Sequence, residues 1–437
     1  MRNYLYIEII LIAIFSIQNL KSQEKLAISK QEVLSKISQR NLTLKISEKD
    51  VEKAKAAYNQ TQAVFLPNIT ASHTGITTTN PLMAFGSKLN QGILTAADFN
   101  PNLLNNPEST QNFATIIKIE QPLINLDGLY QRKAAKSKME AMSLQTERTA
   151  DYLELEVEKA YMQLQLAYKG VNVLENALKT SKAHKKIAMD NFKQGYLQRA
   201  DVLNVDIRVT EVKNQLQTAK SNILNASNYL SFLMNDEGYK IYKPSDSLSV
   251  ISFEINTKKV SRERADIKAM ELSLKVYEAL NKADKMAFLP RLNAFGTYEM
   301  YDNTMFQGNA SGYVLGAQFS WNLFEGSKRI GKAQKSKADA AQSQLAYDQL
   351  ISHSNLELNK AKRQLTDAKN RLELTQLAVQ QSKESLRIRK NRFEEGLEKT
   401  ADLLQSETQF AQKQLEYYQT IFEYNFTQSY IQFLTKE

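Results

Sequence analysis

The stretch FKQGYLQRADVLN at residues 192–204 returns 201 residues later as FEEGLEKTADLLQ at residues 393–405. Five of the thirteen positions are identical, because a phenylalanine, a glycine, an alanine, an aspartate and a leucine recur in the same places. A repeat at one fixed offset is the signature of a duplicated structural unit. The tripeptide Phe-Leu-Pro is also repeated, at 65–67 and 288–290, but with a separation of 223 residues. We therefore predict a duplicated chain whose first half carries an enlarged loop between the two landmarks.

A heptad pattern precedes each copy of this stretch. From Leu358 to Phe393 mostly small or apolar residues recur with three-four spacing over five heptads. The same stripe runs almost intact from Val157 to Phe192, at the same offset of 201 residues. The stripe is narrow and rich in alanine, which predicts helices that pack closely along a thin seam while much of their surface stays in water.

Both heptad segments lack proline, so each can be one long helix, over 127–194 and over 325–395. Gly195 and Gly396 follow as natural left-handed stops. Shorter helices are predicted over 30–64, 200–234, 259–288 and 401–433. The first structural repeat then covers 23–236, the second covers 259–437, and residues 237–258 form a linker, a small belt beside the helices.

Alternating patterns predict two β-hairpins, over 68–121 and 291–322. In the last predicted strand, 313–322, one face is mostly polar and the other is apolar, with Tyr313, Leu315, Ala317, Phe319 and Trp321. The other predicted strands are 68–77, 113–121 and 292–301. Residues 78–111 contain three Asn-Pro pairs and are too long for a tight turn, so we expect an extracellular loop there.

The strands matter because the chain has no apolar run after its first residues that is long enough for a membrane helix. Any membrane crossing would then require a closed β-barrel. Four strands from one chain cannot close a barrel, since the edge strands would leave unpaired amides and carbonyls in lipid, so closure demands several copies. An ordinary soluble sheet packed against the helices is the alternative.

The first 22 residues have the three parts of a secretory signal: a basic start, an apolar stretch and a small residue before the cleavage point. A short membrane anchor is the rival interpretation. The chain has 437 residues, no cysteine and a net charge of +10. Absence of cysteine excludes a disulfide framework and a thiolate metal site. Basic and acidic residues interleave along the predicted helices, which favours solvated helix surface over a nucleic-acid site.

No arrangement of residues points to catalysis, a cofactor or a metal. The three histidines, His73, His184 and His353, are far apart in the sequence, and none has a carboxylate or a second histidine at metal-ligand spacing. We expect them to be surface residues. Neither a phosphate-binding glycine loop nor a nucleophile elbow occurs. The sequence thus predicts a protein that is not an enzyme and has no catalytic, cofactor-binding or metal site.

The signal, the duplicated order of strand hairpin and long helix, and the G-x-x-x-x-A-D-x-L turn together resemble the TolC family of outer membrane efflux proteins. The resemblance covers nearly the whole mature chain. It implies a mainly α fold in which long coiled-coil helices form a periplasmic tunnel. Each chain of a homotrimer would add four strands to one shared β-barrel in the outer membrane of a Gram-negative bacterium, in contact with its lipid.

The resemblance also implies partners and a site. In the family the two helix-to-helix turns meet a periplasmic adaptor (membrane fusion) protein, which links the channel to an inner-membrane pump such as an RND or ABC transporter. The matching residues are Gly195, Leu197, Ala200, Asp201, Leu203, Gly396, Leu397, Ala401, Asp402 and Leu404.

Asp402 is the candidate entrance gate, because the family often rings its tunnel entrance with acids at this place. Simple helix capping is the other interpretation of Asp201 and Asp402. The sequence departs from the family pattern at Glu398, where a basic residue can link neighbouring helices, and at Gln405, where a second acid can stand. Because of those two departures, the sequence does not define which residues lock the closed state.

The predicted function is an outer-membrane exit duct of a tripartite export system. Small-molecule efflux is preferred because family members of that use are numerous, but the same architecture would serve type I protein secretion. A secreted coiled-coil scaffold that never enters a membrane explains the heptads equally well. It leaves the aromatic-ended strands and the paired duplication unexplained.

Overall fold

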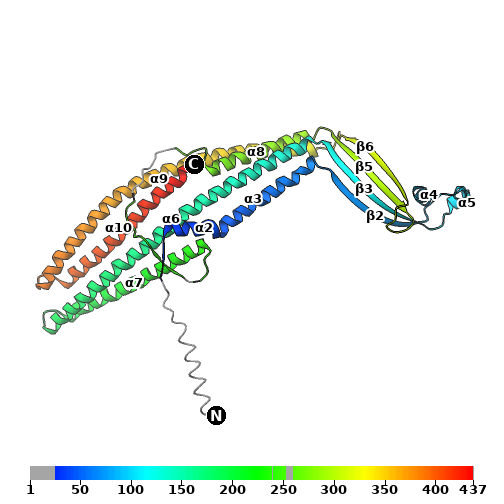
Figure 1. The fold of residues 1–437 in the computed structure, drawn as a ribbon. Helices are drawn as coiled ribbons and strands as arrows, with labels where there is room; N and C mark the ends of the chain where they lie inside the picture. Colours follow the sequence, from blue (N-terminus) through cyan, green and yellow to red (C-terminus); the bar gives the residue numbers. More distant parts are fainter. Residues whose placement is uncertain (1–24, 239, 252–258, 437) are drawn as a thin grey trace, which may run out of the picture. The chain divides into compact units, whose positions relative to one another are not determined.

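In a computed structural model the described residues are 25–238, 240–251 and 259–436, and the chain divides into two compact units (Figure 1). The helical unit contains the residues up to 48 together with 145–267 and 350–437. The sheet unit contains 49–144 and 268–349. Each unit combines segments from both halves of the duplicated chain. The predicted signal over 1–22 and part of the predicted linker lie outside the described residues.

The sheet unit holds four antiparallel strands in the order β2, β3, β5 and β6. Their bounds are Asn68–Thr78, Thr110–Ile124, Arg291–Asp302 and Ala310–Ser320. Both predicted hairpins are therefore confirmed, and β3 extends by three residues at each end beyond the predicted 113–121. The pairing of β3 with β5 joins the two halves of the chain.

The register places most of the apolar residues of the four strands on one face of this sheet. One row across the sheet consists of Ala71, Ile117, Tyr298 and Tyr313. The adjacent row, which points to the opposite face because side chains alternate along a strand, consists of Thr70, Lys118, Thr297 and Val314. One face of the sheet is thus apolar and the other mostly polar, as the last strand alone predicted.

The long connection between β2 and β3 contains three short helices, which the sequence did not predict. They are α4 (Pro81–Asn90), η2 (Ala96–Phe99) and α5 (Pro101–Asn105). Asn80 and Asn100 cap α4 and α5, and each is followed by a proline in the first turn. Two Asn-Pro pairs therefore begin helices instead of marking turns, since proline fits a first helical position whose amide has no partner.

All four helix connections meet the sheet at the same end, because β2 and β5 begin there and β3 and β6 finish there. At this end an arginine from each long helix stacks on the repeated Phe-Leu-Pro landmark. Arg132 lies over Phe65 with 5.7 Å to the ring centroid, and Arg329 lies over Phe288 with 5.1 Å. Cation–π contacts of this kind fix the helix to the strand connection.

The predicted helix over 30–64 is interrupted, so this prediction was wrong in detail. The structure has α2 (Lys30–Arg40), α3 (Leu42–Gln60) and a 3-10 turn, η1 (Thr61–Val64). Asn41 breaks the helix in an extended conformation: its Nδ2 donates to the Leu233 carbonyl at 2.7 Å, and its Oδ1 accepts from the Leu44 amide at 3.1 Å. Similarly α8 (Ala265–Met286) starts six residues later than the predicted 259.

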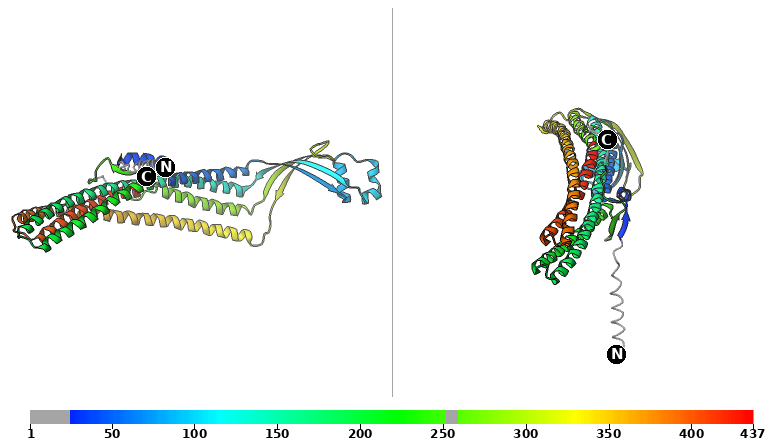
Figure 2. Two further views of the ribbon diagram at one scale, coloured as in Figure 1. Left: turned by 90° about the horizontal axis from the view of Figure 1, so that it is seen from below. Right: turned by 90° about the vertical axis from the view of Figure 1, so that its left-hand side faces the viewer.

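The two long helices are confirmed as α6 (Leu126–Lys193) and α9 (Lys328–Glu394), and both contribute to the two units. The return helices are α7 (Arg199–Met234) and α10 (Thr400–Thr435). None of the stripe positions from Leu358 to Phe393 is exposed, and the same holds from Val157 to Phe192. In the helical unit α7 and α10 lie side by side (Figure 2).

The N-terminal strand β1 (Lys25–Ile28) pairs in parallel with β4 (Ile241–Pro244) of the predicted linker. This pair sits on α6, because the Tyr168 hydroxyl donates to the Tyr242 carbonyl and the Tyr161 hydroxyl to the Ile28 carbonyl. Within the described ranges, no helix combines the length and the apolarity that a membrane span requires.

Candidate functional site

The two turns that join each long helix to its return helix form the candidate site. Gly195 has a φ of 83° and Gly396 a φ of 74°, a region that glycine enters without steric cost. The Gly195 amide donates to the Phe192 carbonyl, and the Gly396 amide to the Phe393 carbonyl, both at 3.0 Å. A second amide closes each helix end one residue later, which is the Schellman pattern. The predicted left-handed stops are confirmed.

In the first turn the aspartate is a helix cap. The Gln198 amide donates to Asp201 Oδ2 at 3.2 Å, and α7 begins at the next residue, Arg199. A carboxylate in this position satisfies a free amide and interacts favourably with the helix dipole. Of the two interpretations that the sequence left open for Asp201, capping is thus present in the structure.

In the second turn the equivalent aspartate has a different neighbour. Asp402 Oδ2 lies 4.0 Å from Arg389 Nη1, and the N-cap residue of α10, Lys399, makes no side-chain cap. The Asp402 side chain is half-exposed. The duplicated aspartates therefore differ in the described chain, one serving its own helix and the other facing an arginine of α9.

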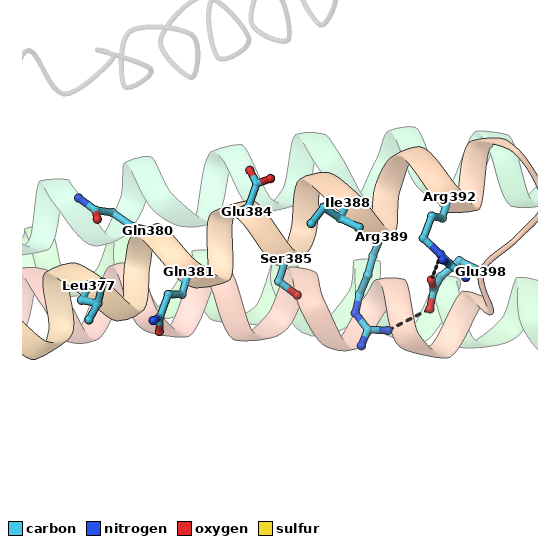
Figure 3. A pocket seen from close by; sticks show the side chains of 9 residues that line it. All are labelled: Leu377, Gln380, Gln381, Glu384, Ser385, Ile388, Arg389, Arg392 and Glu398. Atoms are coloured by element: carbon cyan, nitrogen blue, oxygen red, sulfur yellow. Dashed lines mark hydrogen bonds and ion pairs between the residues drawn. The ribbon is translucent and has the colours of Figure 1, made fainter.

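Glu398 is the centre of a charged cluster at this second turn (Figure 3). It accepts a hydrogen bond from Arg389 at 3.0 Å and another from Arg392 at 2.9 Å, and its side chain is mostly buried. Charge-assisted bonds of this kind are stronger than neutral ones. By the resemblance to the TolC family, a basic residue can link neighbouring helices at this place, whereas here the residue is an acid and its basic partners come from α9.

The repeat shows that this cluster replaces an apolar contact. At an offset of 201 residues, Arg389 corresponds to Ala188 and Glu398 to Leu197. Ala188 and Leu197 pack with Val205 and with Leu404 from the second repeat. The first turn is therefore covered by α10 of the same chain, whereas the second turn has the charged cluster in the equivalent place.

An open groove of about 730 Å³ runs along α9 up to this cluster (Figure 3). Its walls are side chains of one face of α9 and Glu398 itself. The apolar ones are Leu377 and Ile388, and the polar ones include Gln381, Ser385 and Arg389. Among the remaining predicted turn residues, Ala200, Leu203, Leu397 and Ala401 are exposed.

The sequence missed a buried contact between a histidine and a glutamate, three turns from the first glycine stop. His184 on α6 and Glu407 on α10 are only 2% and 5% exposed, with 2.6 Å between Nδ1 and Oε1. The Ser181 hydroxyl donates to the other carboxylate oxygen at 3.4 Å. The expectation that His184 is a surface residue was wrong, because its partner lies on a helix of the other repeat.

His73 is only half-exposed and stacks on Phe306 with 4.4 Å between ring centroids, while His353 is exposed. The part of the chain that the structure describes contains no group of three or more histidine, cysteine, aspartate or glutamate residues able to hold a metal ion.

Comparisons with known proteins agree with this arrangement. The sequence profile of the outer membrane efflux protein family matches residues 33–236 and 257–432. The solved structure of CusC has a TM-score of 0.79 at 15% identity, over 95% of each chain. The CmeC outer membrane channel of Campylobacter jejuni has a TM-score of 0.80 at 18% identity, over 93% of this chain and 85% of that one.

The outer membrane protein VceC of Vibrio cholerae gives a TM-score of 0.77 at 14% identity, over 93% of this chain and 96% of that one. No curated protein matches the sequence. At these identities the solved structures establish a shared fold, the long-helix and four-strand architecture that the duplicated sequence predicted.

Proposed function

Since the chain belongs to the outer membrane efflux protein family, we propose that it is the outer-membrane exit duct of a tripartite export system. It passes small molecules that an inner-membrane pump, of the RND or ABC type, delivers through a periplasmic adaptor. The chain itself performs no chemistry, and the energy comes from the pump. The observation that carries the proposal is the duplicated tip turn combined with a sheet whose two faces differ in polarity.

The sheet is the proposed membrane part. Its apolar face suits contact with lipid, and its polar face suits a water-filled interior. In one chain β2 and β6 are the outer strands, each with one unpaired edge. A membrane cannot satisfy those edges, so the strands of further copies must complete the sheet. A homotrimer in the outer membrane, with its helices in the periplasm, is the assembly that we adopt.

The internal repeat indicates which helices meet between copies. Within one chain α6 packs on α10: Lys169 Nζ lies 5.0 Å from the centre of the Tyr418 ring, and the Arg148 guanidinium 3.6 Å from that of Phe433. Adding 201 to α6 positions gives α9, and subtracting 201 from α10 positions gives α7. The two shifts together turn the α6–α10 contact within one chain into a contact between α9 and α7. We assign this second contact to α9 of one copy and α7 of the next.

Exposure supports this pairing. Val173 on α6 is 5% exposed, whereas its counterpart Leu374 on α9 is 68% exposed. Likewise Phe433 on α10 packs under Arg148, whereas its counterpart Phe232 on α7 is 73% exposed. Apolar side chains thus occupy the faces of α9 and α7 that the repeat assigns to the contact, and burying them would stabilise the assembly.

The two turns are the proposed adaptor surface. Tyr196 and Leu397 follow the two glycines at equivalent positions, and both are exposed. Two neighbouring apolar tips, repeated around a trimer, offer an adaptor six similar contacts. Asp402 is the proposed gate, because three copies of this half-exposed carboxylate would face the entrance.

Cross-linking tests the assembly, and the natural chain has no cysteine to interfere. The α9–α7 pair Asn370→Cys/Gln217→Cys, treated in membranes with a short bifunctional maleimide, should give covalent dimers and trimers. The matched control Lys169→Cys/Tyr418→Cys occupies the equivalent α6–α10 positions and should link only within a chain. Absence of links between copies in the Asn370→Cys/Gln217→Cys variant, while the control still links within its chain, would refute the pairing. Release of the chain by carbonate without detergent would refute the duct and favour a secreted scaffold.

A further inference from the structure

Exposed apolar side chains form a collar at the end of the sheet where the helices begin. Phe65 and Leu66 lie there in the first half, and Leu289, Trp321 and Phe324 in the second. Trp321 is held in place because its indole nitrogen donates to the Phe288 carbonyl at 2.9 Å. Aromatic and apolar residues of this kind mark the level of a membrane–water interface.

The helix segments next to this collar are strongly basic. They comprise 126–138 of α6, 279–291 from the end of α8 to the first residue of β5, and 325–338 around the start of α9, and they hold twelve basic and three acidic residues. We call their basic side chains the basic belt. The opposite end of the sheet has the reverse balance, with one basic and four acidic residues in 78–112 and 299–312. The sheet unit is therefore polarised along its strands.

Most belt lysines are not neutralised by neighbours. Lys332 pairs with Asp284 at 2.9 Å, and Lys136 lies 3.8 Å from Glu140. The structure, over the residues it describes, places no carboxylate within ion-pair distance of six others, all exposed: Lys133, Lys138, Lys282, Lys285, Lys328 and Lys337. Unpaired ammonium groups on neighbouring helix segments repel one another unless an anionic partner or salt screens them.

We propose that the basic belt binds the phosphate headgroups of anionic phospholipids in the membrane leaflet that faces the long helices, an inference that rests on the proposed function. Only a membrane surface offers an anionic layer directly beside an apolar one, in the order that the belt and collar present. Lysine suits this partner, because its long side chain can reach the headgroups while its stem stays against apolar groups.

The dimensions agree for the belt lysines nearest the sheet. The headgroup region on each side of a bilayer is roughly 5–8 Å thick, the difference between its full and hydrocarbon thickness. At about 1.5 Å of rise per residue, Lys328 and Lys332 lie within about 6 Å of the start of α9, and Lys285 lies near the end of α8. Each basic residue at an anionic membrane surface strengthens binding to that surface about fivefold.

Trp321, the one tryptophan of the chain, is the fluorescent probe for the assay. The full-length protein is placed in phosphatidylcholine vesicles that contain a minor fraction of brominated lipid, which quenches tryptophan fluorescence on contact. Brominated phosphatidylglycerol should quench Trp321 about three to five times more effectively than the same fraction of brominated phosphatidylcholine. The triple variant Lys282→Gln/Lys285→Gln/Lys328→Gln should lose most of this preference, and so should the natural protein in molar salt.

The matched control Lys360→Gln/Lys369→Gln/Lys383→Gln removes three exposed lysines of α9 that belong to the helical unit, and should keep the full preference. Equal quenching by the two brominated lipids would overturn the belt while leaving the duct in place. An equal loss in both triple variants would show an effect of net charge and would also overturn it. Absence of quenching by either lipid would mean that the sheet does not enter the bilayer, which contradicts the proposed function itself.

Discussion

Replacing His184 by leucine is expected to leave Glu407 buried without its partner in the contact between α6 and α10. The two side chains are almost completely buried, and 2.6 Å separates Nδ1 from Oε1. Breaking a buried ion pair by removing one partner costs about 3–5 kcal/mol. The Ser181 hydroxyl, at 3.4 Å, still donates to the carboxylate, so we expect the lower end of this range, about 3 kcal/mol.

Amide hydrogen exchange of the detergent-solubilised protein measures this loss locally. A cost of about 3 kcal/mol corresponds to roughly a 150-fold drop in protection, since each 1.4 kcal/mol is a factor of ten. The drop should be confined to α10 around Leu403–Ala411 and the facing turns of α6. Amides of β3, in the other unit, should keep their protection.

The double variant His184→Leu/Glu407→Leu distinguishes a stranded charge from lost packing. Replacing a buried pair by apolar residues is often neutral or stabilising, so the double variant should recover to within about 1 kcal/mol of the natural protein. A single variant whose exchange changes by less than about threefold would refute the idea that Glu407 is a buried charge held by His184. A double variant as labile as the single one would assign the loss to packing.

Two other measurements address the gate and the linker. Asp402→Ala should weaken the block of single-channel current by divalent cations about two- to tenfold, because three carboxylates leave the proposed entrance, and unchanged currents would remove the gate while sparing the fold. Burial above all, with a further contribution from the Asp236 charge, raises the pKa of Tyr242 to about 12. Folding therefore favours the neutral phenol, and this stabilisation is complete below about pH 10 and disappears as the pH rises through about 12. Tyr242→Phe should flatten the alkaline fall in melting temperature, followed by circular dichroism, whereas the exposed Tyr196→Phe should not; identical curves for all three proteins would contradict the assignment.

Local rules made much of the fold predictable from the sequence. The two glycines stop their helices because a left-handed residue is sterically cheap only for glycine, and this holds whatever surrounds the turn. The heptad stripe was predictable because a helix brings every third or fourth residue to one side. Alternation along the last strand predicted its two faces for the same kind of reason.

Other features could not be predicted from the sequence because they depend on residues far away in the chain. Asn41 breaks a helix by donating a hydrogen bond to the Leu233 carbonyl, a contact that no local sequence pattern predicts. The Asn-Pro pairs have the same local chemistry at a turn and at a helix start, and only the three-dimensional setting distinguishes the two. Glu398 accepts hydrogen bonds from Arg389 and Arg392 because the turn folds back along α9, and the sequence alone does not show this.

The sequence by itself determined the duplication, the long helices, their glycine stops and the amphipathic strands, because periodicity and backbone sterics act over a few neighbouring residues. Only the tertiary structure decided that all four strands turn their apolar sides the same way, that His184 is buried against Glu407, and that the two tip aspartates differ in their partners. These outcomes depend on strand register and on which helix faces which, and both are set by packing between segments that are distant in the chain.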